Sequence, residues 1–444
     1  MPFVLMPMKG AGFSQAPPGL ASRQRRTRDL QSSRRLSLVI ASNGVLRVAG
    51  GAGTVLVGIY LADLANRGVN LGAALVGTLA AISYGVELLG AVPLGMLSDA
   101  VSARTLMTGG ASLAGLATLL FGHTHDVGLF AVSRALEGLA AAASVPALLA
   151  YLTDATANAP GLRARAMSYF ELSLLAGVAL GGLVAGQLWA ALHAGAFTAL
   201  ALLYAVAALL LFVGSAESLG HRGADVWQGL LRSLATPQLR RLAPVWLCMN
   251  AIIGVWLGPT LYFLLTNRSD GSQALVGVFA DNPSGLGWLL FAYALVFGTG
   301  VLVWSRVLPR IDLRRALRVS LLAMLAVSTG LLLLNHLGDQ PIQFRWMLIV
   351  VIAALIMIES GFTPAALTLL ASVVGPGVGR GATMGIYSFL LSAGALTGSV
   401  LAGLMGRWMA IDGLTYATLV LAFVAWALLS RLGPVRSVTS EARR

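Results

Sequence analysis

Six charged residues stand inside long apolar stretches of this chain, where a charge is costly unless it has a partner or a use. Arg134 and Glu137 are three residues apart, so a helix would place them on one face, where each lowers the cost of burying the other. A buried glutamate can also hold a proton near neutral pH and release it when water reaches it. The pair therefore predicts either proton-linked chemistry or a fixed ion pair that holds helices together.

Four further charges belong to the same class: Glu87, Glu359, Arg47 and Glu171. Arg47 and Glu171 enter their apolar stretches at similar depth, which predicts that they pair. Glu87 and Glu359 lie near the middle of theirs, so each needs protein, water or a partner beside it. Both are candidates for carrying a proton, and structural hydrogen bonding to a neighbouring helix is an equal alternative.

Several kinds of chemistry are not supported by the residues present. Lys9 is the only lysine and is followed by Gly10, so the chain has no phosphate-binding GxxxxGK[ST] loop. The five histidines lie at the ends of apolar stretches or between them, without an HExxH motif or a cysteine and histidine cluster for a metal. Cys248 is the single cysteine, which excludes an intrachain disulfide. We expect no metal, no cofactor and no enzymatic activity.

The composition indicates which solvent surrounds these charges. Of the 444 residues, 57% are hydrophobic and 11% are charged, and the mean hydropathy is +0.82. A water-soluble domain has roughly a quarter of its residues charged. The excess apolar surface must therefore face lipid, which predicts an all-α integral membrane protein.

Apolar runs long enough to cross the hydrocarbon layer predict twelve transmembrane helices in two bundles of six. The expected helices are 39–65, 72–97, 105–122, 127–153, 163–190, 194–214, 242–266, 284–308, 315–334, 344–371, 381–405 and 412–431. Polar density between the sixth and seventh predicts a linker. The expected division is a basic tail without fixed structure, a first bundle, a cytoplasmic linker, a second bundle and a second tail, at 1–37, 38–215, 216–241, 242–432 and 433–444.

The arginines predict the orientation, because positively charged loops resist translocation across the membrane. With the N-terminus inside, only four basic residues face outward, namely Arg67, Arg268, Arg345 and Arg407. We therefore expect a multi-pass protein of the cell inner (plasma) membrane with both termini in the cytoplasm. The net charge of +13 then reflects orientation and attraction to anionic lipid headgroups, not nucleic-acid binding.

An internal repeat supports two similar halves. Residues 163–186 read RARAMSYFELSLLAGVALGGLVAG, and residues 380–403, which lie 217 positions later, read RGATMGIYSFLLSAGALTGSVLAG. The two segments share an arginine, a methionine and several glycines at matching places. Repeated halves around a central binding site are a common architecture of secondary transporters.

One loop carries most of a resemblance to the major facilitator superfamily, which extends over residues 38–432. The segment GMLSDAVSAR resembles that family's GxLaDrxGrR loop at Gly95, Leu97, Asp99 and Arg104, but has Ala100 and Ser102 where the family has a basic residue and a glycine. The resemblance implies that Asp99 belongs to a cytoplasmic gate. A solvated loop turn is the alternative.

Helices four and five extend the resemblance. The segment SRALEG, with Arg134 and Glu137, is similar to the family's RxxqG pattern, whose arginine is linked to proton movement in proton-coupled members. Gly177, Gly181 and Gly182 match the GxxxGPxxGG signature of antiporters, whereas Ser173 and Val178 replace its first glycine and its proline. Small residues at this spacing also allow close helix packing without antiport.

The sequence thus indicates a transporter that resembles the drug/proton antiporters of this family. We expect proton-coupled efflux of a small amphipathic organic compound by alternating access, with the substrate, protons and the lipid bilayer as partners. We expect a monomer that does not bind nucleic acid. A uniporter or importer of a polar metabolite is an alternative, and a transporter-like receptor or assembly partner without flux is another.

Overall fold

The computed structural model describes residues 18–156, 160–215, 237–268, 271–338, 340–373 and 380–431, and every regular element in these ranges is helical. The first half contains α1 (Pro18–Asn66), α2 (Ala73–Ala100), α3 (Ala103–Gly122), α4 (Val127–Ala155), α5 (Pro160–Leu192) and α6 (Gly195–Gly214). The second half contains α8 (Pro237–Trp256), α9 (Pro259–Thr266), α10 (Pro283–Val307), η1 (Leu308–Arg310), α11 (Leu313–His336), α12 (Ile342–Glu359), α13 (Phe362–Val373) and α14 (Arg380–Arg431).

Eleven segments of the described chain are helical, long enough and apolar enough to cross a membrane. The last of them, 389–431, contains non-helical backbone at Ala410, where φ is 48° and ψ is −128°. This position divides α14 into two arms, each long enough to span the hydrocarbon layer. Counted separately, the two arms give twelve crossings, and the all-α membrane fold expected from the composition is confirmed.

Two of the expected helices are interrupted. Helix seven is divided into α8 and α9 at Gly258 and Pro259, because proline cannot donate a hydrogen bond to the preceding turn. Helix ten is divided into α12 and α13 at Ser360 and Gly361, because Pro364 in the first turn of α13 has no N–H to donate to the carbonyl of Ser360. Glu359 therefore ends a helix rather than lying in the middle of one.

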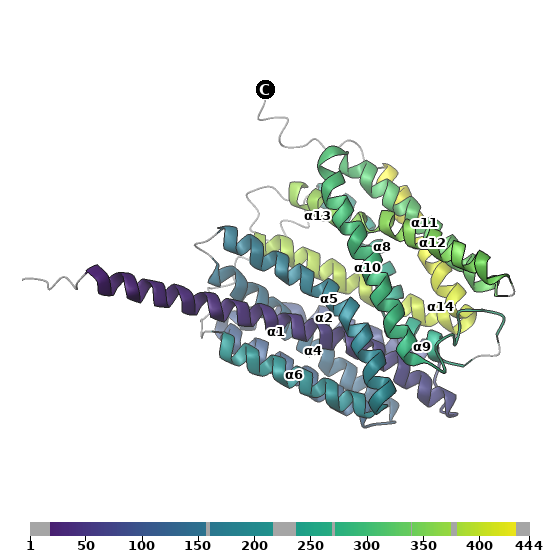
Figure 1. Cartoon of the computed structure of the whole chain (residues 1–444), viewed down its shortest axis with the longest axis horizontal. Coiled ribbons are helices and arrows are strands. Elements are labelled where there is room, and N and C mark those ends of the chain that lie inside the picture. The colour runs from purple at the N-terminus through teal and green to yellow at the C-terminus, as the bar shows by residue number, and fades with distance from the viewer. Residues whose placement is uncertain are drawn as a thin grey trace, which may run out of the picture.

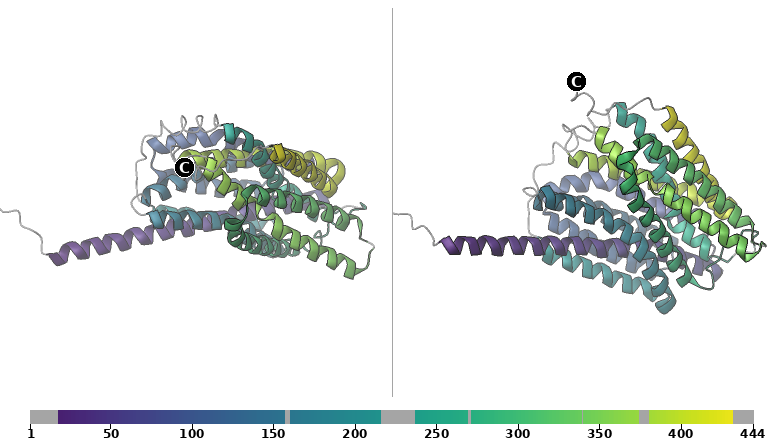
Figure 2. Two further views of the ribbon diagram at one scale, coloured as in Figure 1. Left: turned by 90° about the horizontal axis from the view of Figure 1, so that it is seen from above. Right: turned by 45° about the horizontal axis from the view of Figure 1, so that its top comes forward.

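The basic N-terminal segment also differs from expectation. Residues 18–37 were expected to lack fixed structure, but α1 begins at Pro18 and continues through them into the first membrane crossing. Arginine, glutamine and leucine are favourable helix residues, and the apolar crossing supplies the nucleus from which the helix extends. Figures 1 and 2 show this part of α1 projecting beyond the other helices.

The helices form two groups, α1 to α6 and α8 to α14, in the order of the chain (Figure 1). The predicted linker, 216–241, falls largely on residues outside the described part, so the proposed domain boundaries stay a prediction. The groups touch where α1 meets α9, α2 meets α14, and α5 meets α10.

Glycines of the internal repeat set the helix contacts within each half. A Cβ on Gly177 would lie 2.6 Å from the carbonyl oxygen of Arg47, and one on Gly394 would lie 2.8 Å from the carbonyl carbon of Asn250. These matched positions therefore pack α5 on α1 and α14 on α8 in the same way. The sequence repeat is thus a repeat of helix packing.

The last matched glycines of the repeat contact the opposite half. A Cβ on Gly186 would lie 3.1 Å from the carbonyl oxygen of Pro283, and one on Gly403 would lie 3.0 Å from Cα of Gly77. Asn66 adds hydrogen bonds to the second half, donating to the carbonyl of Thr266 at 3.2 Å and accepting from the amide of Arg268 at 2.8 Å. All these contacts lie away from the chain termini, and the halves diverge toward the other end (Figures 1 and 2).

Candidate functional site

Arg134 and Glu137 form an ion pair within α4, as their spacing predicted. The Arg134 side chain is 4% exposed and its Nε atom has no hydrogen-bond partner, whereas Glu137 is 24% exposed. Gly138 follows the pair and allows α4 to pack closely on α2, where a Cβ would lie 3.1 Å from the amide nitrogen of Glu87. This close approach brings a second acid toward the pair.

Glu87 on α2 connects the pair to the other half of the molecule. Its Oε1 atom accepts a hydrogen bond of 3.3 Å from the hydroxyl of Ser392 on α14. Arg47 and Glu137 lie close enough for their charges to act on Glu87. The fold therefore gathers four of the six predicted charges, Arg47, Glu87, Arg134 and Glu137, at the inner side of the first half.

Arg47 on α1 lies with its guanidinium 5.2 Å from the ring centroid of Phe170 on α5. A cation over an aromatic face is attracted by the ring, which favours burial of the charge. Arg47 has at least one further interaction partner besides the Phe170 ring. Its expected partner, Glu171, is on α5, but the side chain of Glu171 lies outside what the structure describes, so this pair stays a prediction.

Glu359 is placed differently. Among the acids whose side chains the structure describes, it alone has neither a hydrogen bond nor an ion pair. No basic side chain of the described residues lies close enough to act on it. Its charge acts on Tyr293 of α10, which in turn is near Tyr262 of α9.

The helix break beside Glu359 is stabilised by side chains from two other helices. Trp304 of α10 donates its indole N–H to the carbonyls of Met357 and Ile358 at 3.1 and 3.0 Å, and Ser320 of α11 donates to Ile358 at 3.2 Å. Carbonyls freed by a break in lipid must find such donors. Side chains of α10 and α11 therefore stabilise the break, and they do so without using the Glu359 carboxylate.

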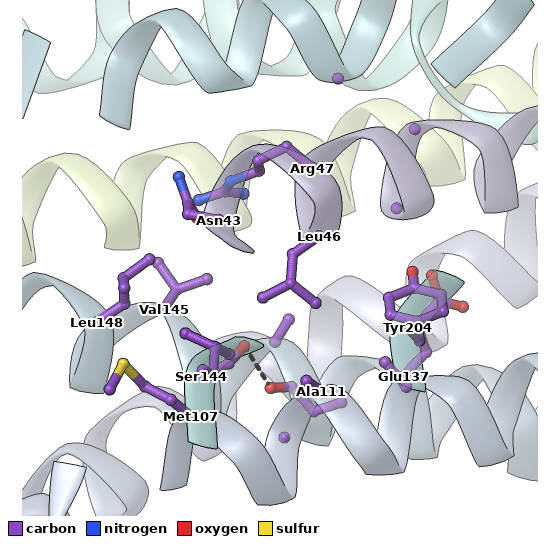
Figure 3. A pocket seen from close by; sticks show the side chains of 18 of the residues that line it. Asn43, Leu46, Arg47, Met107, Ala111, Glu137, Ser144, Val145, Leu148 and Tyr204 are labelled. Atoms are coloured by element: carbon purple, nitrogen blue, oxygen red, sulfur yellow. Dashed lines mark hydrogen bonds between the residues drawn. The ribbon is translucent and has the colours of Figure 1, made fainter. Parts of the chain in front are cut away.

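A cavity of about 260 Å³ lies inside the first half. Its lining comes from α1, α3, α4, α5 and α6, and none of it comes from the second half. Arg47, Glu137 and Tyr204 are among the lining residues, and Figure 3 shows Tyr204 beside Glu137 at one end. The charge cluster thus faces an internal space that is distinct from the interface between the halves.

The loop after helix two is only partly described. Gly95 and Asp99 lie on α2, but the side chain of Asp99 is outside what the structure describes, so its gate role stays a prediction. Leu97 is exposed, and Arg104 lies with its guanidinium 3.8 Å from the ring centroid of Phe212. Ser102 is the N-cap of α3 and accepts a hydrogen bond from the amide of Thr105 at 3.3 Å.

The three glycines of helix five serve two different contacts. Gly177 and Gly181 face α1, and a Cβ on Gly181 would lie 2.7 Å from the amide nitrogen of Ala52. Gly182 faces the other half, where a Cβ would lie 2.7 Å from Leu290 of α10. The motif therefore sets packing both within and between the halves, as small residues do in membranes.

Three residues near the cluster were missed by the sequence reasoning: Tyr84, Tyr204 and Ser392. Tyr84 precedes Glu87 by three residues, so the helical spacing that linked Arg134 to Glu137 would have found it. Tyr204 and Ser392 come from other helices, and no local pattern marks them. Ser392 lies inside the repeat, which had been read only for its glycines.

Comparisons with known proteins agree with this architecture. The sequence model of the Major Facilitator Superfamily matches residues 43–280 and 270–444. No curated protein matches the chain.

Two solved structures have a similar fold. The nucleoside transporter NupG has a TM-score of 0.69 at 13% identity, covering 89% of this chain and 97% of its own. A bacterial homolog of the human lysosomal transporter Spinster, in an inward-facing and unoccupied conformation, has a TM-score of 0.66 at 14% identity, covering 90% and 99%. At such identities the likeness concerns the fold alone. The family match spans nearly all the described helices, and the chain therefore belongs to the Major Facilitator Superfamily of membrane transporters, not to an enzyme family.

Proposed function

We propose that the protein is a proton-coupled secondary transporter that exports a small amphipathic organic compound by alternating access. The observation that carries this proposal is the hydrogen bond between Glu87 and Ser392, because it joins a titratable group of one half to the other half. A carboxylate accepts a stronger hydrogen bond than a neutral acid does. Gain or loss of a proton at Glu87 would therefore change the contact between the halves.

The charges near Glu87 support a role for this residue in binding and releasing a proton. Arg47 and Glu137 carry opposite charges, and both lie close enough to act on Glu87. These influences oppose one another, so a modest change in hydration during rocking is enough to alter the balance. Arg134 holds Glu137 in place, and these two residues are leading candidates for coupling together with Glu87.

Glu359 and the tyrosines near it support an amphipathic substrate. An unpaired carboxylate attracts a cationic or hydrogen-bond-donating group, and aromatic faces attract cations and apolar surface. A compound with an ammonium group on an apolar body would satisfy both. The first half would contribute Glu87 and Tyr84 to the same central region, and the substrate would bind there. The protein would act as a monomer.

The distribution of arginines supports an orientation with both termini in the cytoplasm, and we propose the cell inner membrane as the location. With both termini in the cytoplasm, the contacts between the halves lie on the outer side, and the conformation would be open inward. Cysteines introduced at Ser218 and Ser437, in a Cys248→Ser background, should react with impermeant reagents only from the cytoplasm. Reaction of either from outside intact cells would overturn this orientation.

Flux in proteoliposomes under an imposed pH gradient tests the function. The panel should include amphipathic amines, neutral amphiphiles and nucleosides, with empty vesicles as the control. The proposal expects movement of amphipathic amines that depends on the gradient and that collapses with a protonophore. Movement of a polar metabolite that ignores the gradient would contradict proton-coupled efflux and favour a uniporter.

A further inference from the structure

The cavity inside the first half has a polar end and an apolar end. Glu137, Arg47 and Tyr204 lie at the middle of the membrane-spanning helices, and Met107 and Leu211 lie near the end where α3 begins and α6 ends. Four glycines and four alanines are among its twenty lining residues, so the space results from small side chains on four of the five helices. It therefore extends from the charge cluster toward the side that carries the chain termini.

The opposite side of the cluster is filled. Tyr60, Phe121, Phe130 and Phe197 pack as an aromatic group in which Phe121 and Phe130 have ring centroids 4.5 Å apart. All four are at most 3% exposed, and the Tyr60 hydroxyl donates to the carbonyl of Thr124 at 3.0 Å. Water on the cavity side of Glu137 therefore has no matching path on the other side.

The lining is mostly apolar, but it includes charged and hydroxyl groups that an empty space would leave without hydration. Cavities that stay dry are apolar, whereas this one includes two charged side chains and the Tyr204 hydroxyl. Tyr204 is 5% exposed, yet its hydroxyl has no hydrogen-bond partner in the described protein. A water molecule occupies about 30 Å³ in the liquid, so the cavity has room for several.

The cavity is a poor match for an organic ligand. Its volume lies below the roughly 300–1,000 Å³ of typical small-molecule sites. Its lining also includes no residue of the second half, so a compound between the halves does not enter it directly. Water fits the volume, needs no contact with the second half, and can hydrogen-bond to Tyr204 and to the charged side chains.

We infer that this cavity is a hydrated chamber that passes protons between Glu137 and the side of the termini, separate from the path of the substrate. The inference rests on the proposed proton coupling and adds its route. A hydronium ion in the chamber transfers its proton to the Glu137 carboxylate and becomes water. Neutral Glu137 then no longer pairs with Arg134, and release of the proton to water restores the pair. Tyr204 relays by accepting a hydrogen bond from one water and donating to the next.

Water in the chamber can be tested without any transport. Hydroxyl radicals generated from bound water by a synchrotron X-ray pulse oxidise nearby side chains. Tyr60 is the control, since it has a similarly low exposed fraction in the same half but lies in the aromatic group. We expect Tyr204 to be oxidised several-fold faster than Tyr60 in the purified parent protein. Equal protection of the two tyrosines would show a dry cavity and overturn the inference, whatever happens to coupling.

The proton route is tested by filling the chamber. Ala141→Leu adds three carbons to the lining, and Ala205→Leu makes the same change on the exposed face of α6. We expect Ala141→Leu to lose most pH-driven transport while keeping substrate exchange, and Ala205→Leu to match the parent in both. If Ala141→Leu couples normally while Glu137→Gln does not, the chamber is not the route and the proposed function stands. If the parent shows no pH-driven transport, the proposed function itself fails.

Discussion

The two halves share a packing frame but differ in the charges they carry on it. Gly177 and Gly394 make equivalent close contacts, yet the contact on α1 is made by Arg47 and the one on α8 by Asn250. The first half provides partners for its half-buried acids, Glu87 and Glu137, whereas in the second half Asp412 pairs with His336 but Glu359 has no partner. Under the proposed function, duplicated packing would give the motion its symmetry, and the unequal charges would allow one half to handle protons while the other meets the substrate.

The loops at the ends of the second helix of each half differ in a related way. In the second half Asp312 is the N-cap of α11 and accepts from the amide of Arg315 at 3.2 Å. In the first half Ser102 has that role for α3, so Asp99 is not needed for capping it. This difference leaves Asp99 available for the gate role that the family resemblance implies.

The largest effect is expected from Glu137→Gln, which keeps the shape of the side chain but removes its titration. Loss of one proton-transfer group typically costs about 100-fold or more, so driven transport should fall by that order. Exchange of substrate for substrate needs no net proton transfer and should persist. Both rates can be measured in proteoliposomes.

Glu87→Gln is the comparison for that experiment. Glu87 has no basic residue in its own helix at helical spacing and can carry the proton instead. If both variants accumulate substrate against a gradient like the parent, neither glutamate couples protons. Arg134 and Glu137 would then be a structural pair.

Matched glycine substitutions test the shared frame. Gly186→Val and Gly403→Val each place a side chain where backbone of the other half lies within about 3.4 Å. Overpacking of this kind costs about 1–3 kcal/mol, which should favour separation of the halves at this end by a similar amount in both variants. Distances between spin labels on the two halves would report the shift. A response in one variant alone would show that the contacts are not equivalent.

Glu359→Gln tests the unpaired acid through two readouts. A hydrogen bond to a charged group contributes about 1.5–3 kcal/mol, so affinity for an amphipathic amine should fall by about tenfold or more. Thermal stability should stay the same or rise, because no partner is left behind. Glu137→Gln should instead lower thermal stability, since it leaves the buried Arg134 charge uncompensated. A loss of stability in Glu359→Gln equal to that in Glu137→Gln would mean that both acids are structural.

The smallest effect is expected from Ser392→Ala. It removes one long hydrogen bond to Glu87, which contributes about 0.5–1.5 kcal/mol. The pH at which driven transport is half-maximal should shift while the maximal exchange rate stays close to that of the parent. Ser399→Ala, on the same helix but without a hydrogen bond to Glu87, is the control. Identical pH profiles for all three proteins would remove the cross-half bond from the mechanism.

Local pattern and the lipid solvent were enough to predict much of this protein. Long apolar runs must become helices in a bilayer, because every backbone group needs an internal partner. The repeat predicted two similar halves, and the three-residue spacing predicted the Arg134 and Glu137 pair, since helical geometry fixes which neighbours share a face. The broken helix at Ser360 was not predicted, because hydropathy reports length and not continuity.

Only the tertiary structure decided which distant residues meet. Glu87 and Ser392 are separated by 305 positions, and their hydrogen bond depends on how closely α2 and α14 cross at Gly77 and Gly403. The cavity arises where small residues of four helices leave space, and the helix break beside Glu359 depends on Trp304 and Ser320 of two other helices. Such features depend on side chains from helices far apart in the chain, and the spacing of residues along one helix carries no record of them.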